Sequence, residues 1–181
     1  MPAQSFCLFD TAIGHCAIAW SDASIVGLLL PEDDSAQTAP RMQRQFPKAQ
    51  AGPPLPWVQS VIERIRSLLE GTSIDSLADV PLDMSNVPLF NQRVYDIARS
   101  IAPGQTLSYG EVAAKMGDPG AARAVGQALG HNPFAPIVPC HRVLAAGKRS
   151  GGFSAGGGVT TKLRMLQIEG AQLGDGPGLF D

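Results

Sequence analysis

The spacing of apolar residues in this 181-residue chain changes near residue 86, and this change limits the folds open to it. Up to residue 30, short apolar runs alternate with turn residues, which is typical of β-strands. From residue 87 the apolar residues follow the helical period instead. The chain therefore predicts an α+β fold with two domains, residues 1–86 and residues 87–181.

The first of these domains should be an α/β unit with a small antiparallel sheet. A hairpin turn is expected at Asp22-Ala23, and Gly71-Thr72-Ser73 should end a helix. Residues 79–84 fit either a further strand or an extended linker. The expected strands are residues 5–9, 16–20 and 24–30, and the expected helices are residues 36–45 and 57–69.

The second domain should be mainly helical. Ser108 and Glu111 have the spacing of a capping box, which predicts a helix from Tyr109 to about Met116. Asp118 as N-cap and Pro119 at the first helical position predict that the next helix begins there and runs to about Leu129. Two short helices joined by a tight turn form a helix-turn-helix pattern. The remaining expected elements are helices at 90–101 and 161–169 and a short buried strand at 136–138.

The charges are unevenly distributed along the chain. The net charge is −2, but residues 91–169 contain nine Lys/Arg and four Asp/Glu, a net of +5. A basic C-terminal half suits a polyanion bound through one face, with few phosphate contacts because the excess is modest. No apolar run has membrane-spanning length, so no membrane partner is expected. Three cysteines without framework spacing favour a reducing, cytoplasmic setting.

The motif Pro139-Cys140-His141-Arg142-Val143 places a thiol, an imidazole and a guanidinium on consecutive positions. Pro139 has a fixed φ, so the chain should reach the thiol in a stiff, non-helical conformation. A thiolate is the nucleophilic form of cysteine, and a nearby cation lowers the thiol pKa. Cys140 is therefore a candidate nucleophile. The alternative is that it is an inert, buried packing residue.

Several motifs around Cys140 resemble the O6-alkylguanine-DNA alkyltransferases, also called methylated-DNA–protein-cysteine methyltransferases. The resemblance covers the C-terminal half well and the first 85 residues only loosely. The motifs are FNQRVY (90–95), TLSYGEVA (106–113), AARAVG (121–126), NP (132–133), PCHRV (139–143), GGFS (151–154) and EG (169–170).

The resemblance implies that Cys140 accepts the alkyl group irreversibly, so that each molecule acts once. Glu169 would orient His141, which would act on Cys140 through a water, following the logic of nucleophile, base and orienter. A carboxylate at a helix C-terminus is locally unfavourable, which also singles out Glu169. Asn132 would tie the recognition helix to the active-site segment. Tyr109 would contact the flipped guanine or help to rotate the phosphate.

The implied partner is double-stranded DNA containing O6-alkylguanine, bound through the minor groove by a monomer. Arg123 would occupy the space left by the extruded base, and flipping is needed because the alkyl group is stacked inside the duplex. Val143 would offer its backbone carbonyl to the guanine. No cofactor and no metal are expected. Further expected contacts to DNA or substrate come from Ser108, Ala122, Phe153 and Ser154.

Departures from the family pattern and alternative readings remain. Phe153 replaces a tyrosine of many relatives, and the following loop is Gly-rich (155–158). Cys7, Cys16 and His15 fit no zinc template and have no evident fourth ligand.

The chain could also be a sensor that binds alkylated bases without reacting, a Cys-His hydrolase, or a transcription regulator. Salt-dependent DNA binding and alkyl transfer distinguish these possibilities.

Overall fold

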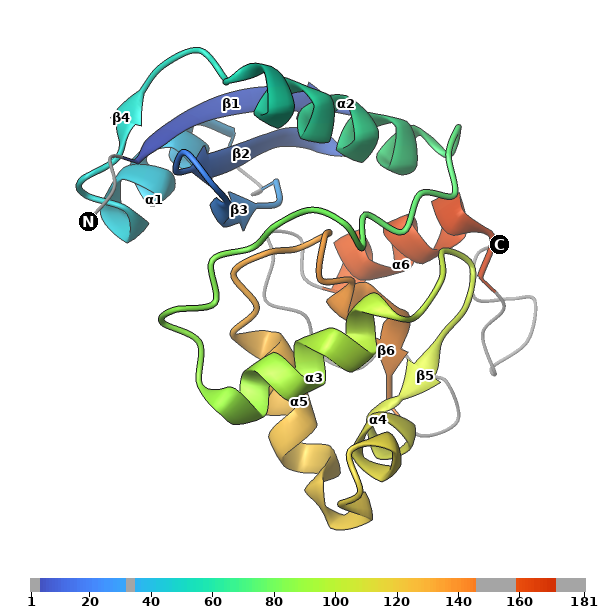
Figure 1. The fold of residues 1–181 in the computed structure, drawn as a ribbon. Helices are drawn as coiled ribbons and strands as arrows, with labels where there is room; N and C mark the ends of the chain where they lie inside the picture. The colour runs from blue at the N-terminus through green and yellow to red at the C-terminus, as the bar shows by residue number, and fades with distance from the viewer. Residues whose placement is uncertain (1–3, 32–34, 146–158, 172–181) are drawn as a thin grey trace.

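The strands of the first half form one sheet in the spatial order β3-β2-β1-β4 (Figure 1). The computed structural model describes residues 4–31, 35–145 and 159–171. Antiparallel pairing joins β1 to β2 and β2 to β3, and β4 runs parallel to β1. The predicted meander is therefore confirmed. The strands are β1 Ser5–Thr11, β2 Gly14–Trp20, β3 Ile25–Leu29 and β4 Gln50–Ala51.

Helices cover both faces of this sheet. On β2, Ala17 and Ala19 pack with Met42 of α1 (Thr38–Gln45), which follows the short 3-10 helix η1 (Ser35–Gln37). Side chains of successive strand residues point to opposite faces, so Ile18 and its alternate neighbours face α2 (Pro56–Glu70) instead. Double coverage explains why β2 is buried almost throughout rather than alternating between buried and exposed. The predicted end of α2 is confirmed by Gly71, which has φ 79°.

A linker then crosses to the second half, held by arginines on both sides. Arg64 of α2 makes a bidentate pair with Asp75, from Nε to Oδ2 (2.6 Å) and from Nη2 to Oδ1 (2.9 Å), and also pairs with Asp79. Arg99, at the end of α3 (Leu89–Arg99), donates to the carbonyls of residues 77, 78 and 80. Of the two structures predicted for residues 79–84, the chain adopts the extended linker, with one bridge from Ile25 to Leu82.

Short helices make up most of the second half, in which β5 (Leu107–Ser108) pairs in parallel with β6 (Val143–Leu144). The predicted capping box begins α4: Glu111 N–H donates to Ser108 Oγ, and Ser108 N–H donates to Glu111 Oε1, both at 3.0 Å. No helix in the described part of the chain is long and apolar enough to cross a bilayer. The helices after α3 are α4 Tyr109–Lys115, η2 Pro119–Ala121, α5 Ala122–Gly130, η3 Cys140–Arg142 and α6 Val159–Glu169.

Two local predictions are wrong. The helix expected to begin at Pro119 begins at Ala122, after a 3-10 turn, and the Asp118 side chain makes no capping hydrogen bond. Gly120, whose conformational freedom disfavours a helix, follows the proline directly. Residues 136–138 are buried as expected but form turns rather than a strand, because Pro136 and Pro139 lack the N–H groups that a strand ladder needs.

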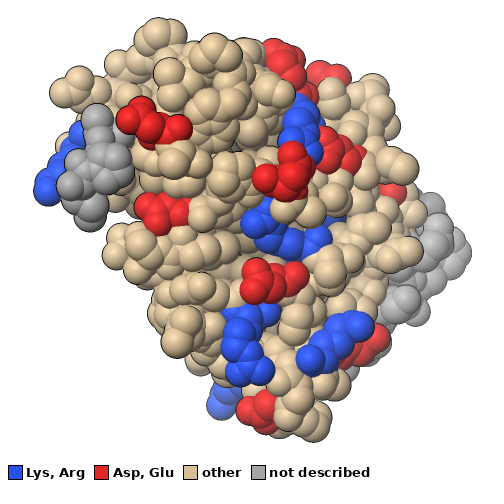
Figure 2. Space-filling model, viewed as in Figure 1, with Lys and Arg blue, Asp and Glu red and all other residues tan. Residues whose placement is uncertain are grey.

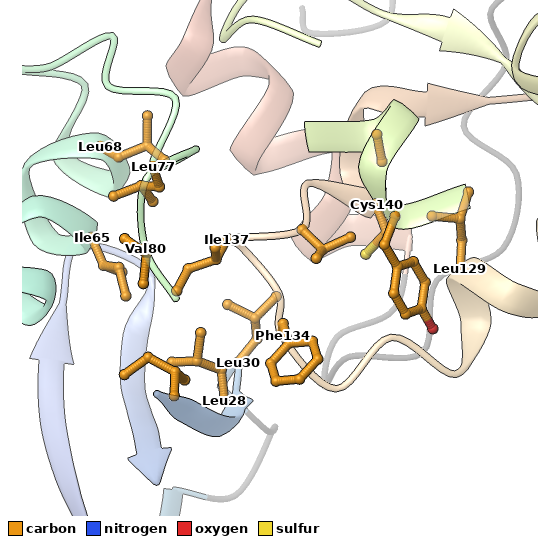
Figure 3. Close-up of a cluster of buried hydrophobic side chains, with 14 of the residues drawn as sticks. Leu28, Leu30, Ile65, Leu68, Leu77, Val80, Leu129, Phe134, Ile137 and Cys140 are labelled. Atoms are coloured by element: carbon orange, nitrogen blue, oxygen red, sulfur yellow. The ribbon is translucent and has the colours of Figure 1, made fainter. Parts of the chain in front are cut away.

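One cluster of buried apolar side chains runs from the sheet into the second half (Figure 3). Ile65 and Leu68 of α2, Leu28 of β3, and Phe134 and Ile137 of the second half all belong to it. Burial of apolar surface is the main stabilising contribution in a fold of this size. The two halves are thus joined by a shared core, and the division at residue 86 stays a prediction.

Candidate active site

Cys140 begins the 3-10 turn η3, at the end of a buried segment that is not a strand. Its side chain is 6% exposed, and its N–H donates to the Val138 carbonyl (2.9 Å). Pro139 precedes it with φ −83° and ψ 68°, outside the helical region. The non-helical, stiff approach predicted for the thiol is therefore present, and η3 leads directly into β6.

Asn132 fixes the shape of this segment with its side chain. Its Nδ2 donates to the Val138 carbonyl (2.8 Å), and its Oδ1 accepts from Phe134 N–H (2.9 Å). Val138 N–H also donates to the Phe134 carbonyl (3.0 Å). Because Asn132 directly follows the end of α5 and His131, these bonds connect that helix to the residue next to Pro139.

The thiol of Cys140 is not activated in the way that the sequence suggested. Burial raises its pKa above the ordinary value for cysteine, although interactions with Asn132 and the charge of Lys162 oppose this. The positive charge of Lys162 therefore does not offset the effect of desolvation on the thiol pKa. To react as a thiolate, Cys140 would need a base that removes its proton. No hydrogen bond joins its thiol directly to the ring of His141 among the described residues.

His141 is fully buried and paired with Glu169. Its Nε2 lies 2.7 Å from Glu169 Oε1, and its Nδ1 has no partner among the described residues. Burial lowers the pKa of His141, although Glu169 opposes this, so the ring is neutral near pH 7. A neutral ring that donates from Nε2 leaves Nδ1 as a proton acceptor. The structure thus brings together the expected orienter and the expected base.

Arg142 completes this buried network and was missed by the sequence analysis as a functional residue. Its Nε donates to Glu169 Oε2 (3.0 Å), and its Nη2 donates to Glu169 Oε1 (2.8 Å). A third bond runs from Nη1 to the Ile101 carbonyl (2.8 Å). Burial would raise the pKa of Glu169, but His141 and Arg142 together lower it to about 2. The carboxylate is therefore charged, and Arg142 neutralises it.

Lys162 was also missed, and it lies beside two expected substrate contacts. It is 1% exposed, and its Nζ donates to the Val143 carbonyl (2.8 Å) and to Tyr109 Oη (3.5 Å). Burial lowers the pKa of Lys162 to about 8, and burial raises the pKa of Tyr109. The only sequence signal was the position of Lys162 two helical turns (seven residues) before Glu169 on α6, so both side chains project from one face of that helix.

The second helix of the predicted pair, α5, has two glycines that face open space. Arg123 is exposed and makes no hydrogen bond or ion pair with another described residue. A Cβ added at Gly126 or Gly130 would meet no atom within 4 Å. These glycines are therefore not needed for packing onto a neighbouring helix. Ala122 begins the helix and is half-buried, and Ser108, whose oxygen accepts the capping bond of α4, lies on the neighbouring element.

The other sequence predictions concern places away from this centre. Phe153 and Ser154 lie outside the described residues. Within the described ranges, no three His, Cys, Asp or Glu side chains are grouped so that they could hold a metal ion. A cavity of about 740 Å³ exists at the junction of the two halves, but its walls include none of Cys140, His141 and Tyr109.

The surface charges are mixed on the face drawn in Figure 2. Basic side chains lie in the lower part, where Figure 1 places the short helices of the second half, but acidic side chains lie beside them. A mixed face neutralises few phosphates. Its pattern is consistent with the modest excess of basic residues counted in the sequence.

Comparison with known proteins identifies relatives of this site. Residues 89–171 match the model of the 6-O-methylguanine DNA methyltransferase, DNA binding domain. A methylated-DNA–protein-cysteine methyltransferase of Mycobacterium tuberculosis is 48% identical over 103 residues, covering 57% of this chain. That alignment spans only 61% of the mycobacterial protein.

Two further relatives match over most of the chain. A methylated-DNA–protein-cysteine methyltransferase of Methanothermobacter thermautotrophicus is 33% identical over 156 residues, covering 86% of this chain and 80% of its own. The crystal structure of Mycobacterium tuberculosis OGT in complex with DNA superimposes with a TM-score of 0.74 at 32% identity, covering 92% of both chains. The shared α+β fold and these identities show that this chain belongs to the methylated-DNA–protein-cysteine methyltransferase family.

Proposed function

We propose that this protein repairs DNA by flipping O6-alkylguanine out of the duplex and transferring the alkyl group irreversibly to Cys140. The observation that carries the proposal is the buried arrangement of Cys140, His141 and Glu169. Arg142 also binds the Glu169 carboxylate. A neutral histidine beside a protonated, buried thiol is the arrangement needed for general-base activation. The relatives named above carry the same activity in their names.

The transfer step begins with proton removal. His141 Nδ1 accepts the thiol proton of Cys140 through a bridging water, and the resulting imidazolium is stabilised by Glu169. The Sγ thiolate attacks the alkyl carbon as the bond from that carbon to O6 breaks. The electron pair of that bond stays on the guanine, and Tyr109 stabilises the resulting anion as a hydrogen-bond donor. The guanine then takes a proton from solvent water, and the His141 imidazolium returns its proton to solvent. The product thioether has no hydrolytic exit, so the protein acts once.

The DNA surface that we propose is α5, placed in the minor groove by a monomer. Its open glycines let the backbone come close to the DNA, and its one charged side chain, Arg123, is unengaged by other described residues. Arg123 would fill the space of the flipped base, while Ser108 and Ala122 would contact the backbone beside it. The Val143 carbonyl would accept from the guanine, sharing its lone pairs with Lys162. The free cysteines Cys7, Cys16 and Cys140 suit a cytoplasmic location.

The direct test is intact mass after incubation with a duplex oligonucleotide that contains one O6-methylguanine. We expect a gain of one methylene, mapped to Cys140, and no gain in Cys140→Ala. With DNA in excess, the number of methyl groups transferred should reach a plateau equal to the amount of protein. Binding of the damaged duplex without any mass gain would indicate a sensor. If the protein neither bound the duplex nor gained mass, the proposal would be refuted.

Arg123→Ala should slow transfer from duplex DNA by about ten-fold, which corresponds to about 1.4 kcal/mol. Loss of the side chain leaves the space of the flipped base unfilled, so the same variant should react almost normally with O6-methylguanine in a single strand. The matched control is Lys115→Ala, which removes the same charge from the exposed end of α4. Equal slowing in both variants, or equal slowing on single and double strands, would contradict the role given to Arg123.

A further inference from the structure

The segment that carries Cys140 is held on one side by the N-terminal sheet. Leu28 N–H of β3 donates to the Pro133 carbonyl (2.9 Å). This bond joins the edge strand of the first half to the residue that follows Asn132. The same edge is bonded to the linker at Ile25, whose N–H donates to the Pro81 carbonyl (2.9 Å). The edge of β3 is therefore occupied by two segments, one of which leads to the thiol.

Phe134 and Ile137 extend this contact into the core. Phe134 is 1% exposed, and Ile137 is fully buried, although neither residue lies in a helix or strand. Both belong to the cluster that includes Leu28, Leu30 and Val80 of the N-terminal half and linker. In Figure 3 the ring of Phe134 lies near Leu28 and Leu30, and Ile137 lies between Leu30 and Val80.

Phe134 also forms a wall of the cavity at the junction of the two halves. Pro133 and Phe134 line it from the segment that leads to Cys140, and all of its other lining residues lie between residues 4 and 87. Among them are Val26 of β3, Phe46 after α1, and Val87 at the end of the linker. On its cavity side the aromatic ring of Phe134 thus faces residues of the sheet, the end of α1 and the linker, and no described helix of the second half lines this cavity.

The opposite side of the same short segment reaches the thiol. Phe134 N–H donates to Asn132 Oδ1, and Asn132 Nδ2 donates to the Val138 carbonyl, which also accepts from Cys140 N–H. A displacement of Phe134 would therefore be passed through Asn132 to the backbone of Cys140. A shift of about 1 Å in a reacting group costs on the order of 10²-fold in rate.

From these contacts we propose that Phe134 is a positioning residue for the alkyl transfer, through which the N-terminal sheet sets the place of Cys140. The inference rests on the proposed function, since the reaction affected is the transfer to Cys140. It assigns to the N-terminal half a part in the transfer step itself. We expect DNA binding by α5 to be unchanged, because Arg123, Gly126 and Gly130 lie on the side of that helix turned away from the buried cluster that contains Phe134.

The test is the transfer rate at saturating O6-methylguanine duplex, and the DNA concentration that gives half of that rate, for Phe134→Ala and for a matched control. Leu68→Ala truncates another buried residue of the same cluster, on α2. Both variants should have a lower melting temperature than the wild-type protein. Only Phe134→Ala should lower the saturated rate, by about ten-fold or more, and its half-saturating DNA concentration should be unchanged. Phe134→Leu, which keeps an apolar side chain in place, should recover most of the rate.

Equal saturated rates for Phe134→Ala and Leu68→Ala would overturn the inference, because Phe134 would then contribute stability alone. If Phe134→Ala does not fold, the smaller truncation Phe134→Val is compared with Leu68→Ala instead, and it should be the slower protein. Alkylation of Cys140 by iodoacetamide separates this inference from the proposed function. If the wild-type protein transfers no methyl group, the proposed function fails, while a change in iodoacetamide reactivity confined to the Phe134 variants would still support the positioning role.

Discussion

Arg142→Met is expected to lower the free energy of unfolding by about 3–5 kcal/mol, because it leaves a buried carboxylate without its partner. Arg142 is 1% exposed, and it holds both oxygens of Glu169. The same change should greatly slow methyl transfer, since Glu169 would no longer be fixed against His141. Urea unfolding and the saturated transfer rate measure the two effects.

A second substitution distinguishes the charge effect from a loss of packing. In Arg142→Met with Glu169→Gln the buried charge is gone, so the double variant should be more stable than Arg142→Met alone. Arg64→Met is the matched surface control, because Arg64 also binds a carboxylate through two nitrogens but is 30% exposed. Arg64→Met should lower the free energy of unfolding by no more than about 1 kcal/mol. A double variant as unstable as the single one would show that the cost lies in packing.

Local patterns in the sequence predicted the elements that are fixed locally. The capping box at Ser108 and Glu111 needs only residues three positions apart, and it is present as predicted. The end of α2 at Gly71 and the meander of the first three strands likewise depend on near neighbours. The shape of residues 132–140 could not be predicted in this way, because it depends on the Asn132 side chain and on a distant N–H of β3.

The buried charges were the harder part of the site to predict. Arg142 and Lys162 belong to residue types that are rarely buried unless they are paired, so a sequence pattern places them in solvent by default. Their partners are Glu169 and the Val143 carbonyl, 27 and 19 residues away in the chain. The link between Glu169 and His141 came from family resemblance, since spacing alone does not bring two residues 28 positions apart together. The raised pKa of Cys140 likewise follows from burial that no motif reports.

The stability of the protein should fall steeply between pH 4.5 and pH 2 because of Glu169. Its pKa is about 2 in the folded protein against 4.5 for the free side chain, owing to His141 and Arg142, which outweigh the effect of burial. Since the folded pKa is the lower one, the unfolded chain takes up the proton first. The stabilisation is therefore complete above pH 4.5 and is lost as the pH falls through 2, and it amounts to about 3 kcal/mol.

His141 should also make the protein less stable as the pH falls, beginning at a higher pH than Glu169. Burial lowers its pKa below the ordinary 6.5, so the unfolded chain binds the proton first and stability begins to fall below pH 6.5. Urea midpoints measured from pH 8 to pH 2 separate the two groups. His141→Gln should flatten the curve just below pH 6.5, and Glu169→Gln should flatten it below pH 4.5. Glu63→Gln, on the exposed surface of α2, is the control for removing one carboxyl group. If Glu169→Gln and Glu63→Gln gave the same slope, the buried network would not be the source of the acid sensitivity.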